Sequence, residues 1–266
     1  MEWIWILPYL GLGLFVGFFA GLLGIGGGGI MVPTLTMLFI AQGLADAQHI
    51  HLALGTSLAS IVVTSISSLR SHHQHGAVQW DIVKAIAPGI LVGTFLLSYF
   101  AYFLSTTFLA ILFSVFMSYV GLQMFLNIKP KPTRQLPGAV GINAAGFGIG
   151  GLSALVAIGG GTLVVPFLTW CNVKIQHAIG TSSAIGLPIA LAGSVGYMLS
   201  GWNVEGLPQY SVGYVYLPAV LFISIVSVFT APIGARLAHT LPVGVLKKIF
   251  AVIMLGLAIK MLQTVL

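Results

Sequence analysis

Long apolar stretches, separated by short polar connections, run along the whole chain of 266 residues. Most are about 20 residues long, the length that a helix needs to cross a bilayer. They fall at about 4–24, 30–41, 51–69, 80–102 and 106–127, and again at about 138–157, 161–172, 178–199, 211–235 and 244–265. The pattern predicts ten helical elements: a first membrane repeat over 1–127, a proline-rich linker at 128–137 and a second membrane repeat over 138–266.

The composition indicates that lipid, rather than water, solvates these elements. Hydrophobic residues make up 58% of the chain and charged residues only 5%, against roughly 25% charged residues in soluble domains. A β-barrel would show short segments of alternating polarity, whereas the apolar runs here are continuous. We therefore expect an all-α polytopic membrane protein.

One glycine motif occurs twice. Residues 25–28 (Ile-Gly-Gly-Gly), followed by Val-Pro at 32–33, return as residues 158–161 and 165–166, at an offset of 133. Glycine runs interrupt helices, and duplicated, interrupted membrane helices are typical of secondary transporters and their binding sites. The last elements of the two halves also resemble each other, which favours duplication of a whole half.

The second element of each half is too short to cross the membrane. About 12 residues of helix cover about 18 Å, and the hydrocarbon core is about 30 Å thick. We therefore expect the first two elements of each half to form a Gly-broken helical hairpin with the glycines at its tip. Non-helical backbone at that depth must be buried in protein or face a water-filled cavity.

The placement of charge supports these hairpins. If each hairpin returns to the side it entered from, nine of the ten basic residues share one face, which is a strong positive-inside signal. If each glycine segment crosses the membrane instead, the ten basic residues split six to four. The first arrangement predicts both termini outside, a cytoplasmic linker and an inverted-topology internal repeat. The nine are Arg70, Lys84, Lys129, Lys131, Arg134, Lys174, Arg236, Lys247 and Lys248.

The glycine tips are the first candidate for a binding site. Exposed N–H groups beside a helix start, together with the partial positive charge there, suit an anion. The alternative is close packing between membrane helices, where small residues are common. The tip residues are Gly26, Gly27, Gly28, Gly29, Gly159, Gly160 and Gly161.

A second repeated motif follows each tip: Ala-Leu-Gly-Thr-Ser at 53–57 and Ala-Ile-Gly-Thr-Ser at 178–182. Its hydroxyl groups can cap a helix or donate hydrogen bonds to an oxyanion. In membrane helices such groups often bond only their own backbone. The candidate substrate-binding hydroxyls are Thr56, Ser57, Thr181, Ser182 and Ser183.

As a pair, the two motifs resemble the TauE/SafE (TSUP) sulfite exporter family over essentially the whole chain. The resemblance implies a carrier in the cell membrane of a bacterium, driven by an ion gradient, that exports sulfite or a related sulfur-containing or organic anion. It also implies that the glycines and the Thr-Ser pairs line the substrate site. Thr162 stands where the symmetry would place a partner for Gly29, and we expect this difference to orient the substrate.

Other residues leave alternatives open. Arg70 and His177 are candidates for access or coupling, and Arg70 could instead only anchor the topology. A proton or a sodium ion could be the coupling ion, and a homodimer stays open. We expect His72, His73 and His75 to lie in a cytoplasmic loop, and this loop allows a second interpretation, a transition-metal permease or channel. A non-transporting scaffold is a third. We expect no enzyme activity, no cofactor, no resident metal and no nucleic-acid partner.

Overall fold

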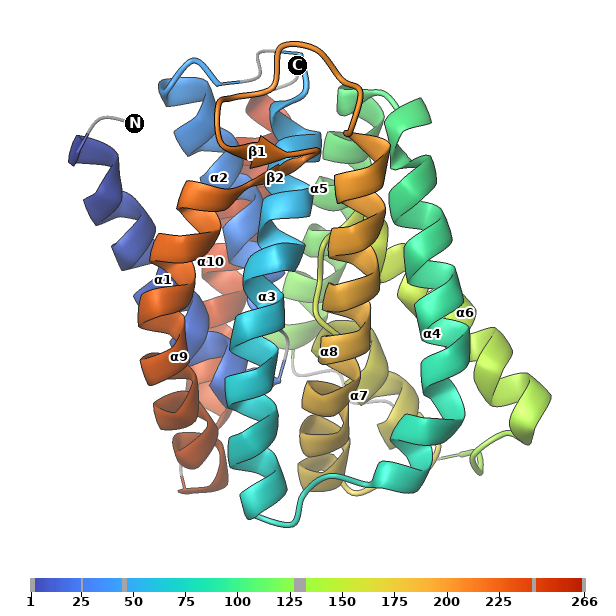
Figure 1. The fold of residues 1–266 in the computed structure, drawn as a ribbon. Coiled ribbons are helices and arrows are strands. Elements are labelled where there is room, and N and C mark those ends of the chain that lie inside the picture. The colour runs from blue at the N-terminus through green and yellow to red at the C-terminus, as the bar shows by residue number, and fades with distance from the viewer. Residues whose placement is uncertain (1–2, 25, 45–46, 127–132, 241–242, 265–266) are drawn as a thin grey trace.

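The computed structural model describes residues 3–24, 26–44, 47–126, 133–240 and 243–264. These residues form one bundle of ten α-helices (Figure 1), with short 3-10 turns at Trp3–Trp5 and Ala101–Phe103. The helices are α1 (Ile6–Leu23), α2 (Gly28–Ala41), α3 (His49–Gln74), α4 (Trp80–Phe100), α5 (Thr106–Phe125), α6 (Ala139–Leu155), α7 (Gly161–Trp170), α8 (Ile175–Ser200), α9 (Leu217–Thr240) and α10 (Val243–Gln263).

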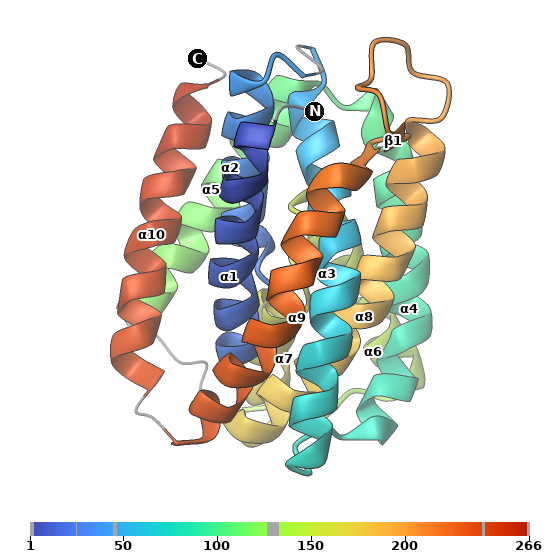
Figure 2. The ribbon, with the colours of Figure 1, turned by 60° about the vertical axis from the view of Figure 1, so that its left-hand side comes forward.

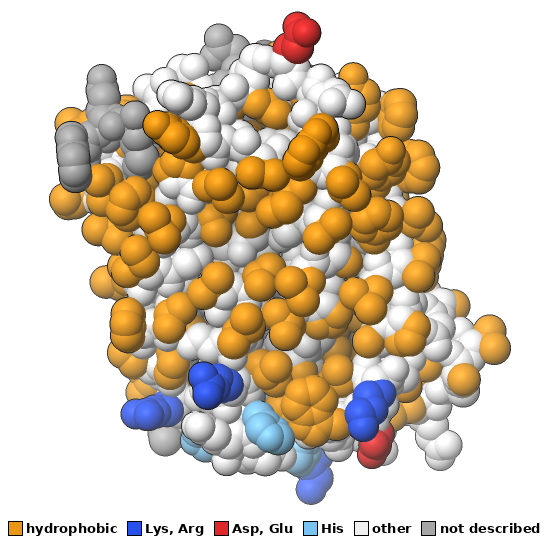
Figure 3. Space-filling model, in the orientation of Figure 1, with side chains coloured by type: hydrophobic (Ala, Val, Ile, Leu, Met, Phe, Trp, Pro, Cys, Tyr) orange, Lys and Arg blue, Asp and Glu red, His pale blue; other side chains and the backbone are white. Residues whose placement is uncertain are grey.

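The bundle has the surface of a membrane protein. Within the described residues six helices are long and apolar enough to cross a bilayer, and α2, α6 and α7 are apolar but shorter. Apolar side chains cover the flank of the bundle in Figure 3, and the basic side chains visible there gather at one end. Both chain ends lie at the opposite end (Figures 1 and 2). The predicted all-α polytopic membrane protein is confirmed.

Each of the ten predicted elements occurs, but the bounds of three of them, α3, α8 and α9, differ from the prediction. The helices α3 and α8 each run for 26 residues, longer than the predicted 51–69 and 178–199, because helix continues through polar residues that the apolar pattern excludes. The start of the ninth element is instead an antiparallel hairpin of β1 (Ser211–Val212) and β2 (Val215–Tyr216). Gly213 makes its turn with a left-handed φ of 54°.

Glycine stripes bring two helix pairs into close contact. Gly13, Gly17 and Gly21 of α1 each lie against the backbone of α9, where any side chain would overlap it. Gly146 and Gly150 of α6 meet the backbone of α4 in the same way. Spacing of four residues puts each stripe on one helix face, and small residues let membrane helices approach closely.

The packing partners exchange between the predicted halves. The first helix of each hairpin packs on the fourth helix of the other half, α1 on α9 and α6 on α4. The helices α3 and α8 pack on each other, as do α5 and α10. If a two-fold axis relates the halves, each contact of this kind must have a counterpart, and the contact of α1 with α9 has one in that of α6 with α4. The inverted repeat itself stays a prediction. The predicted 128–137 linker lies partly outside the described residues.

The threonine of each Gly-Thr-Ser motif holds the start of another helix. Thr56 Oγ1 of α3 accepts a hydrogen bond of 3.0 Å from the N–H of Tyr216, just before α9. Thr181 Oγ1 of α8 accepts one of 3.0 Å from the N–H of Gln79, just before α4. The glycine that precedes each threonine lets the same connection approach the helix closely. Both threonines are fully buried; the bond to Tyr216 is buried and the bond to Gln79 is part-buried.

Replacing either threonine by valine should destabilise the bundle, because it leaves a backbone N–H group at a helix start without its acceptor. We expect Thr56→Val and Thr181→Val each to lower the free energy of unfolding by about 1–3 kcal/mol. Thermal unfolding of the detergent-solubilised protein measures the effect.

The control for this prediction is Thr36→Val. Thr36 is equally buried, but its hydroxyl donates only to Val32 O in its own helix, so the loss should be smaller. Equal melting temperatures for all three variants would contradict the capping role.

Candidate functional site

The first glycine tip is a sharp reversal between α1 and α2. Helix α1 ends at Leu23, and Gly24 follows with a left-handed φ of 68°. Gly26 and Gly27 have φ values of 71° and 80°, a conformation that side chains with a Cβ rarely adopt. Helix α2 then begins at Gly28, so the break falls where the motif predicts it.

The second tip reverses the chain between α6 and α7. Helix α6 ends at Leu155 and α7 begins at Gly161. Here Ala157 has the positive φ, 45°, so the two tips are alike in position but not in backbone detail. Because α2 has 14 residues and α7 has 10, they extend only about 21 and 15 Å and cannot cross the membrane.

The structure brings the two tips into direct contact. A Cβ atom added at Gly26 would lie 2.6 Å from the Cα of Gly159. One added at Gly28 would overlap the carbonyl oxygen of Ala157. The first N–H groups of α2 and α7 and the last carbonyls of α1 and α6 therefore meet in one region, which gives it both donor and acceptor ends of helices.

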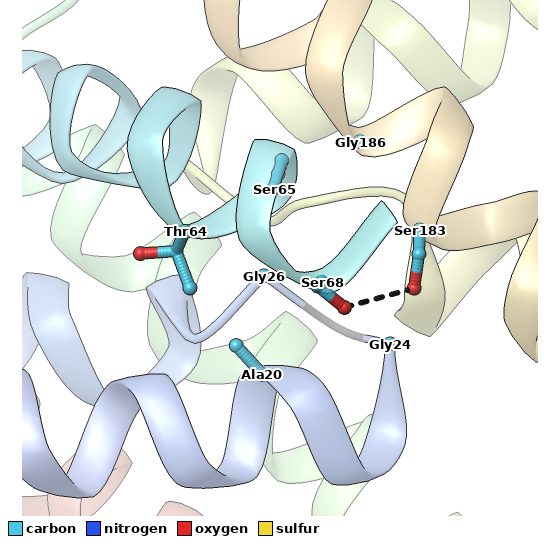
Figure 4. Close-up of a pocket in the computed structure, with 8 residues that line it drawn as sticks. All are labelled: Ala20, Gly24, Gly26, Thr64, Ser65, Ser68, Ser183 and Gly186. Atoms are coloured by element: carbon cyan, nitrogen blue, oxygen red, sulfur yellow. Dashed lines mark hydrogen bonds between the residues drawn. The ribbon is translucent and has the colours of Figure 1, made fainter. Parts of the chain in front are cut away.

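A small polar cavity lies beside the first tip (Figure 4). Ala20, Gly24 and Gly26 form one wall, and α3 and α8 form the rest. The free volume is about 10 Å³, roughly the room of one water molecule. In this conformation the cavity therefore has no room for a molecule larger than water. The residues from α3 and α8 are Thr64, Ser65, Ser68, Ser183 and Gly186.

Neutral hydroxyl groups dominate this cavity. Ser68 Oγ and Ser183 Oγ lie 3.3 Å apart across it, within hydrogen-bond distance. Thr64 Oγ1 lies 3.1 Å from both Ser60 O and Ser227 Oγ. The residues that line the cavity carry no charged side chain. An oxyanion in this place would be held by hydroxyl and backbone donors.

The sequence analysis identified Ser183 but missed the hydroxyl groups that α3 contributes. Thr56, Ser60, Thr64 and Ser68 follow one another at four-residue spacing and are all buried. That spacing puts them in a row on one face of the helix. A polar row in an otherwise apolar membrane helix is the signal that could have revealed them.

The other predicted site residues fall into separate groups. Ser182 Oγ donates to Ile179 O at 2.8 Å and lies near Gly24, and Gly160 lies against the Ser182 carbonyl. Ser57 Oγ is buried with no hydrogen-bond partner among the described residues. The hydroxyl oxygens of Thr56 and Thr181 accept the capping hydrogen bonds described above. Their predicted contact with substrate stays a prediction.

The second residues of α2 and α7 are in unlike surroundings. A Cβ atom at Gly29 would lie 3.2 Å from Met117 Cε and 3.3 Å from Met254 Cε, so α5 and α10 both cover it. Thr162 instead lines a groove between α5 and α7. The predicted asymmetry between these two positions therefore has a physical counterpart.

The two access or coupling candidates lie away from the tips. Arg70 is exposed near the end of α3. His177 lies in the first turn of α8, with Nδ1 3.3 Å from Ala77 O. Both lie near the basic end of the bundle.

The prediction that the histidines at 72–75 form a loop was wrong. His72 and His73 lie in the last turn of α3, which runs to Gln74. His72 is buried with Nε2 3.2 Å from Gly21 O, whereas Nδ1 of His73 accepts from the Trp80 indole and Nδ1 of His75 lies 2.7 Å from Ser71 O. Within the described part of the chain, no three His, Cys, Asp or Glu residues are grouped so that they could hold a metal ion.

Known proteins resemble this chain along nearly its whole length. A probable membrane transporter protein of Haemophilus influenzae is 39% identical over 261 residues, which cover 96% of this chain and 97% of that protein. The probable membrane transporter protein MJ0441 of Methanocaldococcus jannaschii is 29% identical over 247 residues, covering 89% and 88%. YdhB of Bacillus subtilis, also named a probable membrane transporter protein, is 29% identical over 239 residues, covering 87% and 90%.

No solved structure matches the chain significantly. The model of the family described as sulfite exporter TauE/SafE matches residues 9–261. This confirms the family that the paired motifs indicate. The protein is a multi-pass integral membrane protein that belongs to the TauE/SafE sulfite exporter family.

Proposed function

We propose that this protein is a secondary transporter that exports a small sulfur-containing or organic anion, such as sulfite or a sulfonate, by alternating access coupled to a proton or sodium gradient. Family membership and the names of its relatives support a membrane transporter. The observation that carries the proposal is the contact between the two glycine tips beside a cavity lined by hydroxyl groups.

The chemistry of this region suits an oxyanion. Two helices begin at the tips, and N–H groups at helix starts bind anions without a cationic side chain. Serine and threonine hydroxyls add donors whose direction adjusts to the oxygen atoms. The free volume beside the tip holds about one water molecule, so the substrate requires a state in which the surrounding helices have moved apart.

The distribution of charge supports a direction in the membrane. Of the described basic residues, Arg70, Lys84, Lys174, Arg236 and Lys248 lie near the helix ends opposite the chain termini (Figure 1), whereas Lys260 is in the last turn of α10. Basic loops stay in the cytoplasm, so we place this end in the cytoplasm of a bacterial cell and both termini outside.

The contact between the tips should be essential for transport. We expect Gly26→Ala to abolish the flux of labelled sulfite or sulfonate in proteoliposomes, because the new methyl group would displace Gly159.

Gly43→Ala is the matched control. Gly43 has a similar φ of 64° but has no atom within 4 Å of an added Cβ, so this variant adds the same backbone strain without moving a tip. If Gly26→Ala transports as well as Gly43→Ala, the tips do not form the substrate site.

The cavity hydroxyls should contribute directly to anion affinity. We expect Ser68→Ala and Ser183→Ala each to raise the anion concentration for half-maximal flux about ten-fold, the effect of losing one hydrogen bond to a charged group.

Ser194→Ala serves as the control, because Ser194 is buried on the same helix as Ser183 and bonds only Ala190 O. An unchanged half-saturating concentration in both cavity variants would refute the proposed site.

A further inference from the structure

A groove of about 530 Å³ runs between α5 and α7. It shares no lining residue with the cavity beside the first tip. Its wall on α5 includes Phe116, Tyr119 and Gln123, and its wall on α7 includes Thr162, Leu163 and Phe167. Because α7 begins at the glycine tip and ends at Trp170 towards the basic end (Figure 1), the groove joins these two levels of the bundle.

The corresponding place in the other half is filled. There α10 packs along α2, and the methionines of α5 and α10 cover Gly29. Ile30 and Leu163 both stand third in their short helices, but Ile30 is 5% exposed whereas Leu163 is only half-buried and lines the groove. One of two related positions is therefore closed and the other is open.

The inner end of the groove holds a polar atom that nothing in the described residues satisfies. Thr162 is 8% exposed, and its Oγ1 has no hydrogen-bond partner among them. A buried hydroxyl without a partner costs about 1–3 kcal/mol. Thr162 is also the second residue of α7, so its side chain and the partial positive charge of the helix start favour the same kind of ligand.

The outer end of the groove carries a cation. The guanidinium of Arg134 lies over the ring of Trp170, 5.1 Å from its centroid. The Trp170 indole donates to Thr133 Oγ1 at 2.8 Å, and Thr133 and Trp170 both line the groove. A fixed positive charge at the mouth of an apolar channel raises the local concentration of anions.

We propose that the α5–α7 groove is the path by which the anion passes between the basic end and the glycine tips, with Thr162 as its first donor inside. In this structure the groove itself is open towards the basic end, and α10 covers the corresponding place on α2. Alternating access closes α5 onto α7 as α10 leaves α2. This inference rests on the proposed transport function, of which it specifies the route.

Cysteine accessibility tests the route without requiring transport. Cys171 is the single cysteine of the chain. Cys171→Ser therefore leaves no native thiol that could react with a thiol reagent. In this variant, Leu163→Cys and the matched control Ile30→Cys are exposed to a methanethiosulfonate that carries a sulfonate, added from each side of the membrane separately.

We expect Leu163→Cys to react about ten-fold faster than Ile30→Cys, since reaction requires an accessible thiolate. We expect this only from the side on which residues 133–134 lie. Equal rates from both sides, or no reaction from either, would overturn the proposal. So would reaction with a lipid-soluble maleimide alone, because the groove would then hold lipid.

A second measurement concerns Thr162 in the protein with its natural cysteine. Thr162→Val should raise the half-saturating anion concentration about ten-fold, and Thr162→Ser, which keeps the hydroxyl, should restore it. An equal value for the two variants would exclude Thr162 as a donor. If the wild type transports neither sulfite nor a sulfonate, the proposed function fails. The labelling pattern still decides whether the groove is an aqueous route.

Discussion

Irregular backbone in the middle of a membrane must find its hydrogen-bond partners inside the protein, and the rest of this bundle is arranged around that constraint. Both interrupted segments are placed at the same level, where each lies against the other. The contact of Gly26 with Gly159 and of Gly28 with the Ala157 carbonyl leaves no room for side chains. The two longest helices, α3 and α8, pack alongside and supply hydroxyl groups to the small cavity beside the first tip.

Glycine has two distinct physical roles in this chain. At the tips it supplies backbone conformations that other residues avoid, whereas on α1 and α6 it only permits close approach of α9 and α4. The threonines next to it also depart from a single role. Thr56 and Thr181 hold the starts of α9 and α4, while hydroxyl groups further along α3 reach the cavity. Hydroxyl residues therefore hold the starts of helices at one level of the bundle and line the cavity at another.

The sequence predicts the ten helices, the two breaks and the short second helices because these depend on local composition and helix length. It could not predict the hairpin at 211–216, which requires Gly213 to fit against Met198. It also placed His72 in a loop, since a buried histidine bonded to the Gly21 carbonyl is a tertiary contact. The sequence analysis missed Thr64 and Ser68 for a similar reason, because their cavity forms only where α3 packs against α1 and α8. The groove exists because α5 and α7 do not pack closely against each other. That is a property of the tertiary structure, and no local sequence pattern predicts it.

The pairing of α1 with α9 and of α4 with α6 has a consequence for biosynthesis. When α1 has been synthesised, the helix that packs against its row of glycines, α9, is still about 200 residues further along the chain. Until α9 is inserted, lipid or the translocation machinery must cover this glycine face of α1. Neither half can complete its own packing, so separately expressed halves should be stable only when they assemble with each other.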